Sequence, residues 1–138
     1  MTVTIERTED LDACLGLRRT VFIEEQGVSE ADEIDDLDAQ ALHLLAKQAD
    51  RPVGTARVVF ADGIAKIGRV CVLPEARGTG LGAALIRAAL EASRGKAQQA
   101  RLGAQTHALG FYERLGFTAF GPVYDDAGIP HRDMARDI

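Results

Sequence analysis

Six consecutive residues, Arg77-Gly78-Thr79-Gly80-Leu81-Gly82, have the types and spacing of a site for a phosphate group. Three glycines within five positions let the backbone turn tightly and approach a ligand closely. The segment precedes a helical pattern, so its N–H groups and the positive end of that helix favour an anion. The guanidinium of Arg77 adds a fixed positive charge. A glycine-rich turn that binds nothing has the same spacing, so the segment alone leaves both interpretations open.

Two other phosphate-binding motifs fit this segment less well. A Walker A loop requires Gly-Lys-Ser/Thr after the first glycine, and this chain has none there. Gly78-x-Gly80-x-x-Ala83 matches a relaxed dinucleotide fingerprint, but that motif needs an acidic residue about 20 positions later. Residues 98–100 are Gln-Gln-Ala instead. A nicotinamide- or nucleotide-binding protein is therefore only a third interpretation.

A second segment strengthens the case for a coenzyme site. Residues 105–117 read Gln-Thr-His-Ala-Leu-Gly-Phe-Tyr-Glu-Arg-Leu-Gly-Phe. With the loop at 77–82, they resemble the two signatures of the GCN5-related N-acetyltransferase (GNAT) family, Arg/Gln-x-x-Gly-x-Gly/Ala and Asn-x-x-Ala-x-x-Phe-Tyr-x-x-x-Gly-Phe. The chain departs from the second signature at Gln105, where Asn is more usual. Further marks resemble the branch named after ElaA and YjcF: Val21-Phe22-x-x-Glu25-Gln26, an acidic stretch with Asp35, His43, Leu102-x-Ala104-Gln105 and Gly128-Ile129-Pro130-His131.

The resemblance covers nearly the whole chain and implies a fold and a donor substrate. The implied fold is of the α/β (α+β) class, with a mixed, largely antiparallel central sheet flanked by helices in a single domain over residues 1–138. The implied cosubstrate is acetyl-coenzyme A, whose acetyl group passes directly to an amine in a ternary complex without a metal. Its pantetheine arm would lie along a strand edge where a break in sheet pairing frees backbone N–H groups. The implied coenzyme-binding residues are Val70, Cys71, Val72, Arg77, Gly78, Thr79, Gly80, Leu81, Gly82 and Gln105.

Acetyl transfer also needs a proton donor for the departing thiolate and a base for the amine. By resemblance, Tyr112 holds the general-acid position, although a core tyrosine with a satisfied hydroxyl fits the sequence too. Tyr124 has no such motif and is expected to be structural. For the base, Glu25 matches the branch, and His131 lies on a turn that borders the acceptor site in this family. Weaker candidates are Asp35, which also matches the branch, His43, which is expected to pack within a strand, and His107, near a helix start.

Charge is distributed unevenly along the chain. Residues 24–38 hold eight carboxylates and no Lys or Arg, so this acidic segment carries −8 and the other residues carry +3 of the net −5. The net charge argues against general nucleic-acid binding. A solvated face is the ordinary explanation of such a run. If the segment borders the site, it would attract a cationic small molecule or peptide amine as the acceptor.

The pattern of apolar residues and turn signals predicts strands and helices in the order βα, βββ, αβ, αββ. The first predicted elements are a strand around 3–5 and a helix over 11–22, which is capped by Asp10 or Thr8 and ended by Gly27. Three strands follow near 41–48, 53–60 and 64–73, separated by turns at Asp50-Arg51-Pro52 and Asp62-Gly63. The remaining elements are a helix of about 14 residues from Leu81, a strand near 100–105, a helix over 108–115 ended by Gly116, and two strands around a turn at 125–128.

Composition indicates one compact cytoplasmic domain. The chain has 138 residues, 46% of them apolar, which is enough for one sizeable core. No run approaches the roughly 18 apolar residues of a membrane span, and the N-terminus lacks a signal-peptide pattern, so we expect no membrane partner. Cys14 and Cys71 are expected as buried thiols, and no His and Cys residues have the short spacing of a metal site. A homodimer is compatible with the sequence.

Two classes of function therefore lead. The first is an enzyme that acetylates an amine. The second is a binding module, an acyl-coenzyme A sensor that keeps the coenzyme site without turnover. A sensor would bind acetyl-coenzyme A without releasing free thiol, which distinguishes the two in a single assay.

Overall fold

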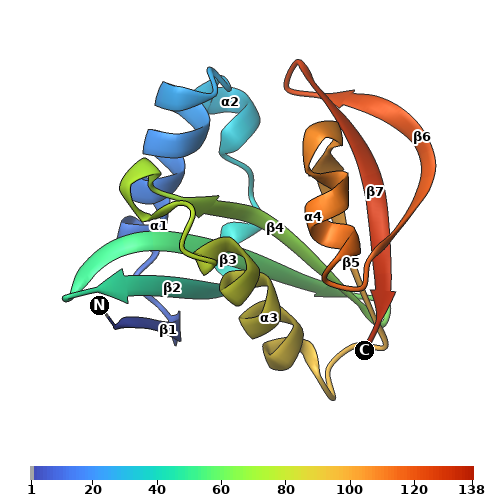
Figure 1. Cartoon of the computed structure of the whole chain (residues 1–138), viewed down its shortest axis with the longest axis horizontal. Coiled ribbons are helices and arrows are strands. Elements are labelled where there is room, and N and C mark those ends of the chain that lie inside the picture. The colour runs from blue at the N-terminus through green and yellow to red at the C-terminus, as the bar shows by residue number, and fades with distance from the viewer. Residues whose placement is uncertain (1) are drawn as a thin grey trace.

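The computed structural model describes residues 2–138, which form one seven-stranded sheet flanked by helices (Figure 1). The strands are β1 (Val3–Thr8), β2 (Leu42–Gln48), β3 (Arg51–Ala61), β4 (Ile64–Val72), β5 (Gln99–Gln105), β6 (Thr118–Asp126) and β7 (Ile129–Asp137). The helices are α1 (Leu11–Arg18), α2 (Glu30–Glu33), α3 (Leu81–Ser93) and α4 (Leu109–Glu113), with a π-helical turn η1 (Arg19–Glu25) and 3-10 turns η2 (Asp38–Gln40), η3 (Pro74–Ala76) and η4 (Thr106–Ala108). The order across the sheet is β1-β2-β3-β4-β5-β7-β6, and among these seven strands of residues 2–138 only β4 and β5 pair in parallel. The predicted fold class is confirmed.

The first two hairpins turn at short polar connections. β2 and β3 are joined at Ala49-Asp50, and β3 and β4 at Asp62-Gly63. All four residues have positive φ, as the two-residue turns that match the twist of a hairpin require. The predicted meander is therefore present, but its first turn lies earlier than expected, and β3 already begins at Arg51.

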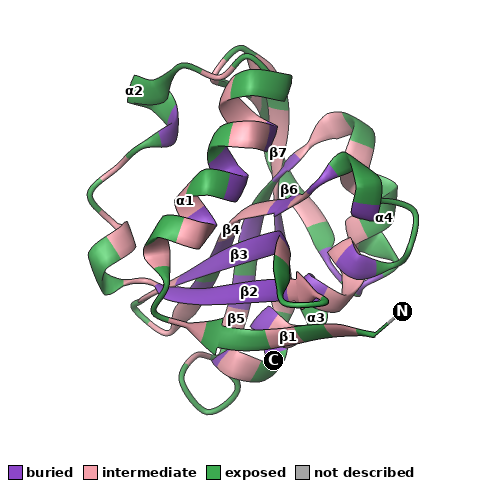
Figure 2. Cartoon of the chain, turned by 90° about the vertical axis from the view of Figure 1, so that its left-hand side faces the viewer, coloured by how far each residue is buried: buried purple, intermediate pink, exposed green. Residues whose placement is uncertain are grey.

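Helices cover both faces of the sheet, and each face has its own apolar cluster. On one face α3 buries Leu85 and Ile86 in the larger cluster, to which β2, β3, β4 and β5 also contribute. On the other face α1 lies in front of the buried strands β2 and β3 (Figure 2). The smaller cluster beneath it contains Cys14, Leu17, Val21, Leu45, Cys71 and Leu73. Both cysteines are buried free thiols, as predicted.

The first helical segment changes its winding part-way along. Asp10 caps α1, since its Oδ1 accepts a hydrogen bond of 3.2 Å from the Ala13 amide. The helix then continues as η1 to Glu25, and Gly27 with a φ of +74° follows. A π turn carries more residues than an α turn and therefore rotates the side chains that follow it. None of the helices in residues 2–138 has the length and apolar character that a bilayer span requires.

The parallel pair β4–β5 separates along its length. Pairing is limited to Ile64 with Gln99, Ala65 with Ala100, and Lys66 with Arg101. β5 continues by pairing with β7 along its whole length, while β4 stays with β3. The two strands therefore diverge after Lys66 and leave an opening in the sheet between their C-terminal halves.

A β-bulge interrupts β4 beside this opening. Cys71 pairs with Thr55 and Gly68 with Arg57, so Arg69 and Val70 both lie opposite Ala56. The extra residue shifts the alternation of side chains along the strand. Val70 consequently faces the same cluster as Ile67, and Cys71 faces the cluster under α1. Strict alternation would have exchanged these two positions.

Candidate active site

The opening between β4 and β5 contains two adjoining cavities. We call the first the inner cavity; it measures about 440 Å³, and its wall includes Gly68, Arg69, Tyr112, Tyr124 and His131. We call the second the edge cavity; it measures about 530 Å³ and lies at the end of β4, with Glu25, Cys71, Val72, Arg77 and His107 in its wall. The two share the lining residues Gln26, Val70, Gln105 and Ile129. A molecule in one cavity can therefore meet a molecule in the other.

The glycine-rich loop lies between β4 and α3, in the strand–loop–helix setting expected of it. Gly78 and Gly80 have φ values of +76° and +83°, in the region that favours glycine. A Cβ atom at either position would meet nothing within 4 Å, so the backbone angle rather than crowding explains these glycines. Gly80 is the N-cap of α3 and supplies no side-chain cap. The first N–H groups of α3 therefore remain available to an anion.

Arg77 is held by Glu25 at the rim of the edge cavity. Its Nη1 and Nη2 atoms donate hydrogen bonds of 2.7 and 2.6 Å to the two carboxylate oxygens of Glu25, and its Nε donates to the Val72 carbonyl at 3.0 Å. These bonds from Arg77 lower the pKa of Glu25. A carboxylate with a lowered pKa is a weaker base. The surroundings of Glu25 therefore argue against its expected role as the general base.

The predicted pantetheine edge, Val70 to Val72, begins at the bulge. The register shift leaves the β3–β4 ladder interrupted between Gly68 and Cys71, which leaves backbone groups for another partner. Cys71 is buried, and burial raises the pKa of its thiol to about 12. At neutral pH the sulfur is therefore a protonated, apolar group, and Cys71 can serve a coenzyme through its backbone.

Tyr112 lies on α4 in the wall of the inner cavity. Its ring packs edge-to-face against Phe111 at 5.0 Å and Phe117 at 6.2 Å between centroids. Burial raises the pKa of its phenol, which therefore keeps its proton at neutral pH. Within residues 2–138, every buried side-chain N or O atom has a hydrogen-bond partner. The Tyr112 hydroxyl has no hydrogen-bond partner among these residues, so its oxygen is not one of the fully buried atoms and is accessible from the cavity.

His131 lies on β7 in the same wall, between Gln105 of β5 and Tyr124 of β6. Its Nδ1 is 2.8 Å from the Ile129 carbonyl oxygen. A carbonyl oxygen only accepts hydrogen bonds, so Nδ1 must carry the proton and Nε2 of the neutral ring is left with a free lone pair. The ring stacks on Tyr124 at 6.0 Å, which fixes its orientation.

Tyr124 has the structural role expected of it, through a contact that the sequence did not reveal. Its hydroxyl donates a hydrogen bond of 2.7 Å to Oδ1 of Asp133. Burial and the neighbouring carboxylate of Asp133 raise the pKa of this phenol. A Cβ atom on Gly103 would lie 2.5 Å from the hydroxyl. Gly103 of β5 is therefore required, because the Tyr124 hydroxyl that binds Asp133 of β7 also lies this close to β5.

Gln105 bridges two elements at the boundary of the two cavities. Its Nε2 donates a 3.2 Å hydrogen bond to Oε1 of Gln26, and its Oε1 lies 2.7 Å from Nε2 of His107. Gln26 is part of the segment Val21-Phe22-x-x-Glu25-Gln26 that resembles the ElaA and YjcF branch, but nothing in the sequence assigned it to the site. It directly follows the π-helical turn η1.

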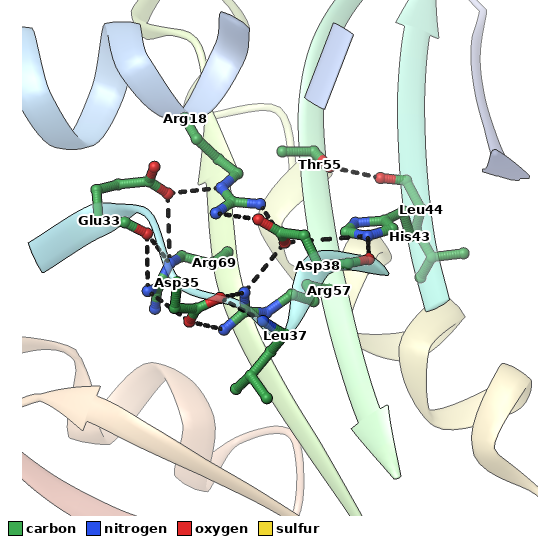
Figure 3. A network of polar contacts seen from close by, with 10 residues as sticks. All are labelled: Arg18, Glu33, Asp35, Leu37, Asp38, His43, Leu44, Thr55, Arg57 and Arg69. Carbon is green, nitrogen blue, oxygen red and sulfur yellow. Dashed lines mark hydrogen bonds and ion pairs between the residues drawn. The ribbon is translucent and has the colours of Figure 1, made fainter. Parts of the chain in front are cut away.

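The acidic segment is largely neutralised by ion pairs, which differs from the solvated face that ordinarily explains such a run. Three arginines from other elements pair with its carboxylates in a partly buried network (Figure 3). Arg18, only 1% exposed, binds Glu33 at 2.6 Å and Asp38 at 2.7 Å. The remaining pairs are Arg57 with Asp35 and Asp38, and Arg69 with Glu33 and Asp35; Arg19 with Glu30 and Arg77 with Glu25 lie outside this network. Five of the eight carboxylates thus have a cationic partner.

The network also engages two of the weaker candidates for the general base, His43 and Asp35. His43 is buried in β2, with its Nε2 2.9 Å from the Asp38 carbonyl, so it packs within a strand as expected. Hydrogen bonds from Arg57 hold the pKa of Asp35 well below its usual range, at about 2. Asp35 is therefore anionic and paired at neutral pH, and is unsuited to accept a proton. No group of three or more His, Cys, Asp or Glu residues within 2–138 could hold a metal ion.

Comparison with known proteins agrees with this geometry. Residues 16–138 match the family model described as Acetyltransferase (GNAT) domain. The chain belongs to the GNAT acetyltransferase family. Among its relatives, the uncharacterised N-acetyltransferase YjcF of Bacillus subtilis is 35% identical over 98% of both chains. Protein ElaA of Escherichia coli is 37% identical over 93% of this chain and 88% of its own. The resemblance to the ElaA/YjcF-like branch is confirmed.

Two solved structures have the same fold as this chain. An acyl-CoA N-acyltransferase from Pseudomonas aeruginosa is 34% identical and superposes with a TM-score of 0.86, with 98% of each chain covered. Escherichia coli ElaA gives a TM-score of 0.86 at 32% identity, over 98% of this chain and 99% of that one. Membership of the family supports acyl transfer from coenzyme A as the chemistry of this chain.

Proposed function

We propose that the protein is an N-acetyltransferase that transfers an acetyl group from acetyl-coenzyme A directly to an amine in a ternary complex. The observation that carries the proposal is the pair of adjoining cavities in the opening of the sheet. One lies beside the glycine loop and suits the donor; the other contains titratable side chains and suits the acceptor. Because they share Val70 and Gln105, the two substrates can meet without a covalent enzyme intermediate.

The coenzyme is proposed to enter through the edge cavity. The first N–H groups of α3 and the glycine loop, residues 78–82, would bind the pyrophosphate, with Arg77 as the cationic partner. The interrupted edge at Val70 to Val72 would accompany the pantetheine arm, and one of its N–H groups would face the oxyanion that develops on the thioester carbonyl. Gln105, at the boundary between the cavities, would contact the same arm.

Two side chains of the inner cavity are proposed to move protons. Tyr112 keeps its proton at neutral pH and has an accessible hydroxyl, as a donor to the departing thiolate must. His131 has its Nε2 lone pair free, so it can remove a proton from the amine. We assign the base to His131 rather than Glu25, since Glu25 is engaged with Arg77.

The acceptor is proposed to be a cationic small-molecule or peptide amine. Asp32 of α2 and Asp126 of β6 both line the inner cavity, and neither has an ion pair among residues 2–138. An alkyl ammonium is almost wholly protonated at neutral pH, because its pKa is about 10.4. Two unpaired carboxylates at the cavity would attract this cation before His131 deprotonates it. Lys66 in the same wall contributes one opposing positive charge against these two carboxylates.

The experiment is an acceptor screen that measures both thiol release and the mass of the acetylated product. Asp32→Asn and Asp126→Asn should raise the Michaelis constant of a cationic acceptor, and added salt should do the same. Asp36→Asn is the matched control, since Asp36 belongs to the same acidic segment but lines neither cavity. Equal effects of Asp32→Asn and Asp36→Asn would contradict the acceptor assignment.

Binding is measured in parallel by thermal unfolding. Acetyl-coenzyme A at 100 times its dissociation constant should raise the free energy of unfolding by about 2.7 kcal/mol. Stabilisation without thiol release for any amine would indicate a sensor. Stabilisation by NADH or ATP but not by acetyl-coenzyme A would contradict the proposed function altogether.

A further inference from the structure

Arg69 adopts a backbone conformation that is unusual for its place in the fold. Its φ is +52°, in the left-handed region that non-glycine residues rarely adopt. The other non-glycine residues of 2–138 with positive φ, Ala49, Asp50, Asp62 and Ala127, lie in two-residue hairpin turns, where such angles are required. Arg69 lies within strand β4, as the extra residue of the bulge. Something other than a turn must therefore hold it there.

The Arg69 side chain supplies that restraint. Its Nε and Nη2 donate hydrogen bonds of 3.3 and 3.0 Å to the backbone carbonyl of Glu33, and Nη2 donates a further bond of 3.2 Å to Oδ2 of Asp35. Nε is also 3.3 Å from a carboxylate oxygen of Glu33. The guanidinium therefore bridges the bulge to the chain that follows α2, as Figure 3 shows.

The far end of this bridge is itself fixed. The Glu33 carboxylate, 4% exposed, binds Arg18 of α1, and the Asp35 carboxylate receives two hydrogen bonds from Arg57 of β3. Arg18 and Arg57 are both buried. A clamp anchored in two buried arginines limits how far the bulge can move, whereas a clamp to a mobile loop would not.

The bulge is also where the proposed site needs its backbone to be held. Val70 follows Arg69 directly, lines both cavities and begins the edge proposed to face the thioester. Backbone donors that stabilise an oxyanion are effective only when they are aimed before the reaction begins. A displacement of the bulge would move these donors while leaving the glycine loop, on the following segment, in place.

We propose that Arg69 is a positioning residue for acyl transfer: its clamp on the Glu33 carbonyl and the Asp35 carboxylate holds the β4 bulge so that the Val70–Val72 backbone faces the donor. This inference rests on the proposed function. In this proposal Glu33 and Asp35 of the acidic segment position the site through Arg69, independently of any attraction of the acceptor.

The test compares Arg69→Gly with Asp62→Gly. Both replace a left-handed non-glycine residue by glycine, but Asp62 lies in a hairpin turn and lines neither cavity. Arg69→Gly relieves the backbone and removes the clamp, so kcat should fall about 10- to 10²-fold, the range expected for small misplacements in a site. The dissociation constant of acetyl-coenzyme A should stay within about threefold, since the loop that binds its phosphates is untouched. Asp62→Gly should change neither quantity.

Amide hydrogen exchange gives a readout that does not depend on turnover. In Arg69→Gly, the amides of residues 70–72 should exchange faster, while those of the β6–β7 hairpin stay unchanged. Arg69→Lys keeps one cationic donor and should restore part of the protection and of kcat. It also carries the test if Arg69→Gly does not fold.

Two results would overturn the proposal. If only the melting temperature falls, with kcat and the exchange of residues 70–72 unchanged, the clamp is structural. If the Michaelis constant of the acceptor rises alone, Arg69 contacts the acceptor instead. Failure of the wild-type protein to acetylate any amine would contradict the proposed function, and the exchange comparison would still decide whether Arg69 holds the bulge.

Discussion

Arg77 and Glu25, 52 residues apart in the sequence, form a two-pronged ion pair at 2.6 and 2.7 Å on the rim of the edge cavity. Arg77 follows η3 beyond the end of β4 and Glu25 ends η1, so the pair joins the glycine loop to the helical segment on the sheet face opposite α3. An anion that binds Arg77 must either share the Arg77 guanidinium with the Glu25 carboxylate or displace that carboxylate.

This competition predicts opposite effects of two substitutions on the affinity for acetyl-coenzyme A. Arg77→Ala removes a charged contact and should weaken binding about 10- to 10²-fold. Glu25→Gln removes the competitor and should strengthen binding by less than about fivefold, because the pair is solvent-exposed. Titration calorimetry measures both, with Glu24→Gln as the neighbouring control. A large loss of kcat in Glu25→Gln at saturating substrates would restore Glu25 as the base.

Tyr112→Phe should separate chemistry from binding. The ring would still pack against Phe111 and Phe117, so coenzyme affinity and stability should change little. Loss of the proton donor should slow turnover by about 10² to 10⁴. Tyr124→Phe is the matched control: it loses the bond to Asp133 and therefore stability, but keeps the donor. Turnover at the wild-type rate in Tyr112→Phe would make water the donor.

Sequence patterns predicted the parts of this fold that depend on neighbouring residues. The hairpins follow from local turn residues, and the loop at 77–82 from glycine spacing and the helix after it. The ion network did not follow from the sequence, because Arg18, Arg57 and Arg69 belong to separate elements and meet the acidic segment only in the folded chain. The separation of β4 from β5 depends on strand register, which a single sequence does not specify.

The pairing of Asp35 predicts how stability depends on pH. Its pKa in the folded protein is about 2, against about 3.9 for an unperturbed aspartate, so the folded state favours the ionised form. The stabilisation is fully present above the unfolded value and is lost as pH falls from about 4 toward 2. The Asp35→Asn variant should therefore have a lower free energy of unfolding than the wild-type protein at neutral pH. It should also lose less of that free energy as the pH falls from about 4 toward 2. Parallel acid-unfolding curves for the two proteins would contradict the assignment.

His131 as the base predicts a second, separate pH effect on turnover. Protonation of Nε2 would remove the lone pair that accepts the amine proton, so kcat/KM should fall on the acid side of its profile. His131→Ala should lower kcat and abolish this limb. His107→Ala should keep the limb, even if its contact with Gln105 alters coenzyme affinity. An acid limb that survives in His131→Ala would assign the base to another group.

Gly103 and Tyr124 give a prediction about stability that is independent of the proposed function. A methyl group on residue 103 would lie 2.5 Å from the Tyr124 hydroxyl, far inside van der Waals contact. Gly103→Ala should therefore force the ring away and break its bond to Asp133, at a cost of about 1–3 kcal/mol. Tyr124→Phe removes the hydroxyl that clashes. Because both substitutions act on one contact, the double variant should be less destabilised than the sum of the single variants.

Urea unfolding of the four proteins in this cycle measures the coupling directly. The residues lie on different strands, and β5 and β6 are both paired with β7, so the interaction is tertiary. Gly121→Ala is a control for the loss of a glycine from this part of the sheet, since a Cβ there would meet nothing within 4 Å. It should be destabilised through its φ of +73°, but should be additive with Tyr124→Phe. Additivity of Gly103→Ala with Tyr124→Phe as well would show that the hydroxyl does not require the glycine.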